Sequence, residues 1–117
     1  IIARRPEYLP YICDALTEAA VRARFAHFLA DASAGSVERF VLPGAHAINF
    51  LLHDVLGGGG VASLRNDPQG KGYAQLLLSC PIPIPDKLAK TVAAELAATL
   101  AETVLTATLS ATSTERV

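Results

Sequence analysis

The chain has 117 residues and a formal net charge of -1, with 51% apolar and only 18% charged residues. This length allows one domain with a buried core, and the high apolar share favours a surface partly covered by a partner. The near-zero charge and 6% aromatic content exclude the basic, stacking surface of a nucleic-acid-binding protein. No apolar run reaches the about 20 residues of a membrane-spanning helix, and no signal peptide is visible, so we expect a cytoplasmic protein.

The two cysteines, Cys13 and Cys80, are far apart and form no Cys-x-x-Cys pair. We therefore expect buried thiols in a reducing compartment, with no metal and no cofactor. The chain contains no Met and begins Ile1-Ile2-Ala3, which is typical of the end of a strand. This start leads us to expect further residues upstream of Ile1.

Residues 1–16 predict a short strand followed by a helix that begins near Pro6, since Pro is tolerated in a first turn. Thr17 is expected to cap a second helix. The small and polar residues 32–36 predict the exit from that helix. Apolar residues at helical spacing mark one face of each helix: Leu9, Ile12, Cys13 and Leu16 in the first, and Val21, Phe25, Phe28 and Leu29 in the second.

Residues 37–42 are rich in β-branched and aromatic residues and predict a strand that ends at Pro43 and Gly44. Residues 45–56 predict a helix, stopped by Gly57 in the C′ position. The residues expected to face the core from this helix are Ile48, Leu51, Leu52, Val55 and Leu56.

Residues 61–65 and 73–80 predict the two strands of a hairpin, because residues 66–70 carry the Asn, Asp, Pro and Gly of a turn. The alternating prolines of residues 81–85 predict an extended edge without ladder bonds. Asp86 is expected to cap a last helix that runs to about residue 109 and frays over residues 106–114. Its apolar stripe, with few charges around it, favours a homo-oligomer contact.

The predicted helix over residues 45–56 would place His46, Asn49 and His53 on one face at i, i+3 and i+7. Two imidazoles and a carboxamide there can orient a carbonyl or move a proton. The alternative is an ordinary polar face. Arg65, at a strand end, can bind a carboxylate or phosphate, or belong to a solvated turn. A metal site is not expected here, because His46 and His53 would supply only two ligands, two helical turns apart, and no third ligand is evident.

The stretch from residue 51 to residue 85 holds six of the eight glycines and four of the seven prolines. Its glycine run invites a phosphate-loop interpretation. However, the run follows a predicted helix instead of preceding one, and no Lys-Ser or Lys-Thr comes after it. We expect a tight connection, or a close approach of the backbone to a partner or a flat ligand. The candidate cofactor-binding residues are Gly57, Gly58, Gly59 and Gly60.

Several stretches taken together resemble the small ferredoxin-fold domain of the AtuA-like family (acyclic terpene utilisation protein A) over roughly residues 1–85. The most specific unit is the glycine run with Val61-Ala62-Ser63-Leu64-Arg65, followed by Asp67-Pro68-Gln69-Gly70-Lys71. The other matching stretches are residues 1–9, 37–40, 42–44, 47–50 and 53–54. A Ser-Gly-Asp-Lys-Gly type segment and an Asn before the first strand, typical of the family, are absent here, and the helix after Pro85 extends beyond the pattern.

The resemblance implies a ferredoxin-like domain that is fused behind a larger AtuA-type domain or accompanies it as a small subunit. It implies a role in bacterial catabolism of terpenoid or other acyl-CoA compounds, without assigning a reaction or a catalytic residue. We therefore expect a single α+β domain with two layers. Its mixed, mostly antiparallel sheet carries helices on one face over residues 1–85, and residues 86–117 add a C-terminal helix. The alternative is a non-catalytic, self-associating structural protein.

Overall fold

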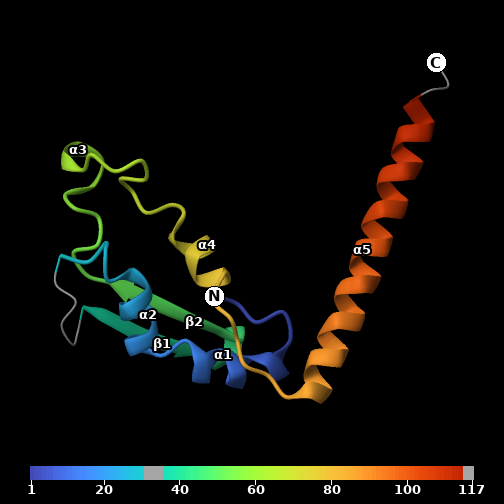
Figure 1. Ribbon diagram of the computed structural model, residues 1–117, viewed down its shortest axis with the longest axis horizontal. Helices are drawn as coiled ribbons and strands as arrows, with labels where there is room; N and C mark the ends of the chain where they lie inside the picture. The colour runs from blue at the N-terminus through green and yellow to red at the C-terminus, as the bar shows by residue number, and fades with distance from the viewer. Residues whose placement is uncertain (31–35, 115–117) are drawn as a thin grey trace. The chain divides into compact units, whose positions relative to one another are not determined.

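The computed structural model describes residues 1–30 and 36–114, with side chains described as far as Val104. The chain divides into two compact units, Ile1–Pro83 and Ile84–Val117. Figure 1 labels the elements of both units. The helix exit predicted at residues 32–36 falls, except for Ser36, outside the described residues. Within the part of the chain that is described, no helix has the length and apolar character needed to cross a membrane.

The helices near the N-terminus form where the sequence predicts them. The 3-10 helix η1 (Pro6–Tyr8) leads into α1 (Leu9–Ala15), and α2 (Glu18–Phe25) follows. Thr17 caps α2 as expected, because its side-chain oxygen accepts a hydrogen bond from the Ala20 N–H at 3.1 Å. The α2 stripe is buried at Val21 and Phe25, which fixes the helix on the core.

The central sheet is an antiparallel hairpin of β1 (Val37–Leu42) and β2 (Ala47–Leu52), in register from Val37 opposite Leu52 to Leu42 opposite Ala47. The prediction of β1 is confirmed, and the helix predicted over residues 45–56 is wrong. A short apolar run fits the periodicity of a helix as well as that of a strand. Here the chain reverses through the 3-10 turn η2 (Pro43–Ala45) and through His46, whose backbone is in the left-handed conformation. Residues 47–52 therefore lie alongside β1, and their hydrogen-bonded pairing with it makes them a strand.

A third strand piece lies on the other edge of β2, where Ile2 pairs antiparallel with Ala47. The Ile48 N–H donates to the Ile1 carbonyl at 2.8 Å, and the Ala3 N–H donates to the His46 carbonyl at 2.8 Å. The short strand predicted at residues 1–3 is thus confirmed. Strand, helices and two further strands form a split β-α-β unit, which is the first half of a ferredoxin-like order.

Residues 57–80 form two short helices joined by turns, so the predicted hairpin of residues 61–65 and 73–80 is wrong. The chain makes the short α3 (Gly59–Ala62) and then α4 (Tyr73–Leu78). The predicted turn between them exists, with Gly70 at φ 65°. Both carboxylate oxygens of Asp67 accept main-chain N–H groups, from Lys71 at 2.9 Å and Gly72 at 2.8 Å. Since these N–H groups lie just ahead of α4, the turn leads into a helix and not into a strand.

The core of the first unit lies between the sheet and the helices. Phe25, Ile48, Val21 and Val37 have the largest fully buried side chains. The connected core cluster consists of Leu16, Val21, Phe25, Leu29, Val37, Val55 and Leu77. Arg39 ties the sheet to α1, because its guanidinium donates to the carbonyls of Cys13 at 2.6 Å and Leu16 at 3.1 Å.

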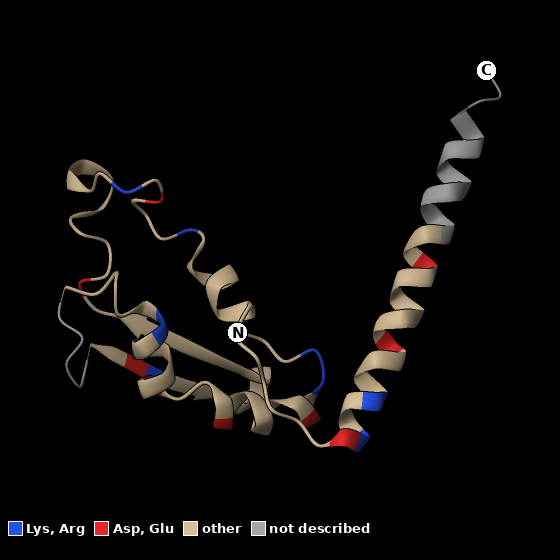
Figure 2. Cartoon of the chain, in the orientation of Figure 1, with Lys and Arg blue, Asp and Glu red and all other residues tan. Residues whose placement is uncertain are grey.

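The second unit contains the helix α5 (Asp86–Thr114), which confirms the predicted C-terminal helix and extends it beyond residue 109. Residues 81–85 form no regular element, as their prolines predict. Charged residues are sparse along α5 (Figure 2). Its side chains at Leu96, Leu100 and Val104 are 53%, 57% and 65% exposed. Helices, an antiparallel sheet and the added helix confirm the predicted α+β class.

Candidate functional site

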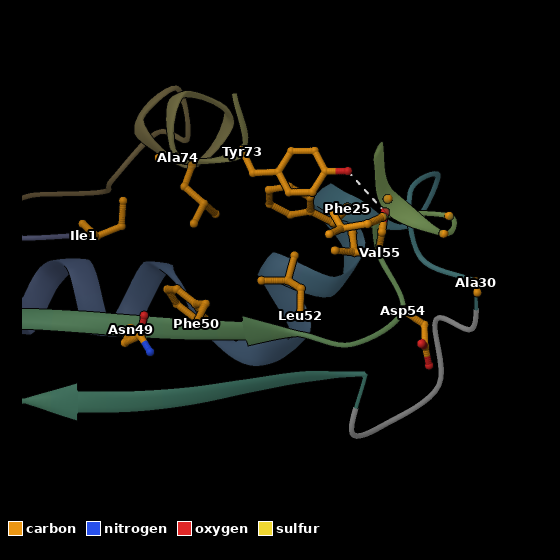
Figure 3. A pocket seen from close by; sticks show the side chains of 15 residues that line it. Ile1, Phe25, Ala30, Asn49, Phe50, Leu52, Asp54, Val55, Tyr73 and Ala74 are labelled. Atoms are coloured by element: carbon orange, nitrogen blue, oxygen red, sulfur yellow. Dashed lines mark hydrogen bonds between the residues drawn. The ribbon is translucent and has the colours of Figure 1, made fainter. Parts of the chain in front are cut away.

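The first unit contains a cavity of about 860 Å³ between β2, the loop that follows it and α4. Figure 3 shows Leu52 pointing from β2 into this space, with Tyr73 and Ala74 of α4 across from it. The lining is mostly apolar, and its size is in the range of small-molecule sites. The lining residues are Ile1, Phe25, Ala30, Asn49, Phe50, Leu52, Asp54, Val55, Leu56, Gly57, Gly58, Gly59, Tyr73, Ala74 and Leu77.

An aromatic cluster closes the end of the cavity near α2. The Tyr73 ring meets Phe25 edge-on, with centroids 5.2 Å apart, and lies tilted against Phe28 at 5.1 Å. Both distances are in the range in which aromatic rings attract one another beyond simple burial. This cluster fixes α4 against α2 and so holds one wall of the cavity in place.

The carbonyl of Val55 connects three parts of the chain around the cavity. It accepts hydrogen bonds from the Tyr73 hydroxyl at 3.2 Å and from Arg65 Nη1 at 2.7 Å. Arg65 Nη2 also donates to the Phe28 carbonyl at 3.3 Å, and the guanidinium lies 5.5 Å from the Phe28 ring centroid. Arg65 thus holds two carbonyls of the fold and is not among the residues that line the cavity.

The glycine run makes a tight connection, and the predicted helix before it does not exist. Gly57, Gly58 and Gly59 all have positive φ, and the run leads into α3, a helix of only four residues. A Cβ on Gly58 would lie 2.7 Å from the Ala62 Cβ, so this residue must be glycine. The first three glycines line the cavity, while Gly60 is not among the lining residues.

The three polar residues predicted on one helix face lie apart. His46 and His53 flank opposite ends of β2, and seven residues at the strand rise separate them by about 23 Å. His53 pairs through Nε2 with the Glu38 carboxylate on the surface. Asn49 is among the residues that line the cavity from β2. Successive side chains of a strand alternate between its faces, so the Asn49 side chain lies on the sheet face opposite Phe50, the outer face that it shares with Phe40. The structure does not assemble a catalytic group from these residues.

Charged groups around the cavity are few. Of the described residues in the lining, Asp54 alone carries a charged side chain, and its φ of 50° bends the chain after β2. Over residues 1–30 and 36–104, no three His, Cys, Asp or Glu side chains gather as a metal site. Farther along the chain, the Gly72 N–H, followed by that of Lys71, lowers the pKa of Asp67 from its ordinary 3.8.

Sequence reasoning missed the residues that form most of this cavity. Phe50 and Leu52 were not expected to line it, because the strand was predicted as a helix. Tyr73 was placed in a predicted strand. The available signal was the four-residue stretch 43–46 between two apolar runs, a loop length typical of a hairpin.

Comparison with known proteins identifies the first unit. The family model described as the AtuA ferredoxin-like domain matches residues 1–83. No curated protein matches the chain, and no solved structure matches it. The matched residues coincide with the unit Ile1–Pro83 and contain the whole cavity.

Proposed function

This chain belongs to the family of AtuA ferredoxin-like domains, and we propose that it is an accessory domain or small subunit of a larger AtuA-type protein. The proposed setting is bacterial catabolism of terpenoid or other acyl-CoA compounds, in the cytoplasm. The observation that carries this proposal is the family match over the entire first unit, residues 1–83.

The outer face of the sheet supports a partner on this domain. Alternation along the strands places Phe40, Leu42 and Leu51 on the face opposite Val37 and Phe50. These three side chains are 45%, 46% and 46% exposed. Several exposed apolar side chains on one sheet face are typical of an interaction surface. We place the contact with the larger partner on this outer face.

The placement of the candidate residues supports an accessory role over independent catalysis. General acid–base chemistry needs groups within hydrogen-bonding reach of one substrate. His46 and His53 flank opposite ends of β2, and Arg65 is bound to the carbonyls of Val55 and Phe28. In our proposal the partner supplies the reacting groups and most of any acyl-CoA site. This domain contributes one wall of that site, formed by the lining of its cavity and the main chain of Gly57.

Copurification tests the proposal. The tagged chain is coexpressed with a larger AtuA-type protein from the same bacterium, and the affinity of the complex is measured. We expect Phe40→Ser to weaken it at least tenfold, because the loss of one buried aromatic contact in an interface costs more than about 1.4 kcal/mol. Val61→Ser is the matched control, since Val61 is fully exposed on α3, away from the sheet. Absence of a complex, or equal weakening by both variants, contradicts the proposal.

A second candidate function is self-association without catalysis, favoured by the exposed stripe of Leu96, Leu100 and Val104 on α5. It requires a homo-oligomer whose contacts lie in the second unit. It is compatible with the accessory role, because the two proposed surfaces belong to different units.

A further inference from the structure

A second hollow in the first unit, of about 310 Å³, shares no lining residue with the cavity beside β2. It lies where the turn between α1 and α2 meets the segment that follows α4. Its floor is apolar, because Leu16 and Val21 belong to the buried core cluster. Its volume is at the lower end of small-molecule sites. The lining residues are Ala15, Leu16, Ala20, Val21, Arg24, Ser79, Cys80 and Pro81.

Arg24 gives this hollow a positive charge. It is the one charged side chain that the described structure places in this lining. Its Nη2 donates to the Ser79 hydroxyl oxygen at 2.9 Å. The Ser79 hydroxyl donates its own proton to the Leu76 carbonyl at 2.8 Å, so its oxygen remains an acceptor for Arg24. The C-terminal end of α4 thus holds the guanidinium beside the hollow.

The guanidinium of Arg24 keeps donors for a further group. A guanidinium carries five N–H donors in a planar fork. Over residues 1–30 and 36–104, the bond to Ser79 is the one hydrogen bond observed for the Arg24 side chain, and no carboxylate pairs with it. A planar fork of donors matches the two oxygens of a carboxylate. The hollow therefore combines a carboxylate-binding group with an apolar floor.

We propose that this hollow binds a small aliphatic monocarboxylate. The two oxygens of the ligand accept hydrogen bonds from Arg24, and its hydrocarbon chain covers Leu16 and Val21. The volume of about 310 Å³ limits this chain to a few carbons. An anion of several charges is disfavoured, since the described lining supplies a single guanidinium to compensate them. The inference goes beyond the proposed function, because this site needs no larger partner.

NMR titration of the full chain with sodium hexanoate, at constant ionic strength and neutral pH, tests the proposal. The amide signals of Ala20, Ser79 and Cys80 should shift saturably, with a dissociation constant in the millimolar range expected for so small a ligand. Acetate has the carboxylate without the chain, and 1-hexanol has the chain without the charge. Each should bind about tenfold more weakly than hexanoate, because each meets only one part of the site.

Two pairs of variants test the charged and the apolar part of the site separately. Arg24→Met should weaken hexanoate binding about tenfold, whereas Arg22→Met, on the same helix but outside the lining, should leave it unchanged. Ala20→Leu should fill the hollow from α2 and weaken binding, whereas Ala19→Leu, exposed and outside the lining, should not. Circular dichroism checks that all four variants fold. If Arg24→Met does not fold, the comparison of hexanoate with 1-hexanol still tests the charge.

Three results overturn the proposal. One is the absence of saturable shifts of the three amide signals at tens of millimolar hexanoate. Another is 1-hexanol that binds as tightly as hexanoate, which would make the hollow a site for hydrocarbon alone. The third is equal weakening by Arg24→Met and Arg22→Met, which would show a general attraction of the anion to basic side chains. Each leaves the proposed function standing if Phe40→Ser still weakens the complex, because Phe40 lies on the outer sheet face.

Discussion

Replacing Arg65 by Met should destabilise the first unit without removing a ligand contact. The substitution deletes two charge-assisted hydrogen bonds, to the carbonyls of Val55 at 2.7 Å and Phe28 at 3.3 Å. It also removes the guanidinium from the Phe28 ring, 5.5 Å away. A hydrogen bond from a charged group contributes about 1.5–3 kcal/mol, and an exposed cation–π contact about 0.5–1 kcal/mol. Since Arg65 is exposed and its second bond is long, we expect a net loss of about 2 kcal/mol.

Urea denaturation followed by circular dichroism measures this loss. The midpoint should fall at an unchanged slope, and the melting temperature should drop by about 10 °C for a unit of this size. Arg4→Met is the control, because Arg4 is exposed and no side-chain bond of Arg4 is observed in the described structure; it should change the stability by less than about 0.5 kcal/mol. Unchanged stability of Arg65→Met, together with weaker binding of an acyl-CoA, would refute the reasoning and make Arg65 a ligand group.

A double-mutant cycle with Tyr73→Phe sharpens the same test. The Val55 carbonyl has two donors, and either single substitution leaves it one. The double variant leaves this carbonyl of a buried residue without either donor, which adds the desolvation penalty of about 1–3 kcal/mol. The loss of stability in the double variant should therefore exceed the sum of the losses in the two single variants. Strict additivity would show that the carbonyl reaches water in the folded state.

The remaining predictions concern a glycine, a carboxylate and the last helix. Gly58→Ala should lower the free energy of unfolding by about 1–3 kcal/mol, because φ is +88° and the new Cβ clashes; Gly44→Ala, with open space around it, should be nearly neutral in urea denaturation. Because the pKa of Asp67 is lower in the folded than in the unfolded protein, its ionised carboxylate stabilises the fold at pH values above the unfolded pKa of 3.8. This stabilisation is lost as the pH falls through the lower pKa of the folded state. Urea midpoints of the wild type and Asp67→Asn should converge below pH 3.8, and a constant difference would contradict this. Leu96→Lys and Leu100→Lys should shift the mass in light scattering to that of a monomer, whereas an unchanged oligomer would remove α5 from the contact.

Local signals in the sequence were sufficient where one interaction decides the structure. Thr17 caps α2 through its own side chain. Residues 37–42 are rich in β-branched and aromatic residues, which favour a strand, and they form β1. The long helix α5 follows from helix-favouring residues over many turns. These elements needed no knowledge of distant contacts, and each was predicted correctly.

The helix and the hairpin strands predicted within residues 45–80 are wrong because distant contacts decide the structure there. In β2, Ile48, Leu51 and Leu52 fit a helical stripe as well as a strand, and only the ladder with β1 separates the two. On α4, Tyr73 and Leu77 bury against Phe25 and the core cluster, which a single sequence does not reveal. The candidate site depended on the wrong helix, so His46, Asn49 and His53 were grouped although the strand separates them.

The glycine run acquires its meaning from the residues around it and not from a bound phosphate. Three successive positive φ angles at Gly57, Gly58 and Gly59 let the chain reverse directly after Val55. That reversal brings Arg65 back to the Val55 carbonyl, where Tyr73 also donates. A residue with a side chain at Gly58 would push α3 away and carry Arg65 with it. The requirement for this sequence unit therefore follows from its role in building one wall of the cavity.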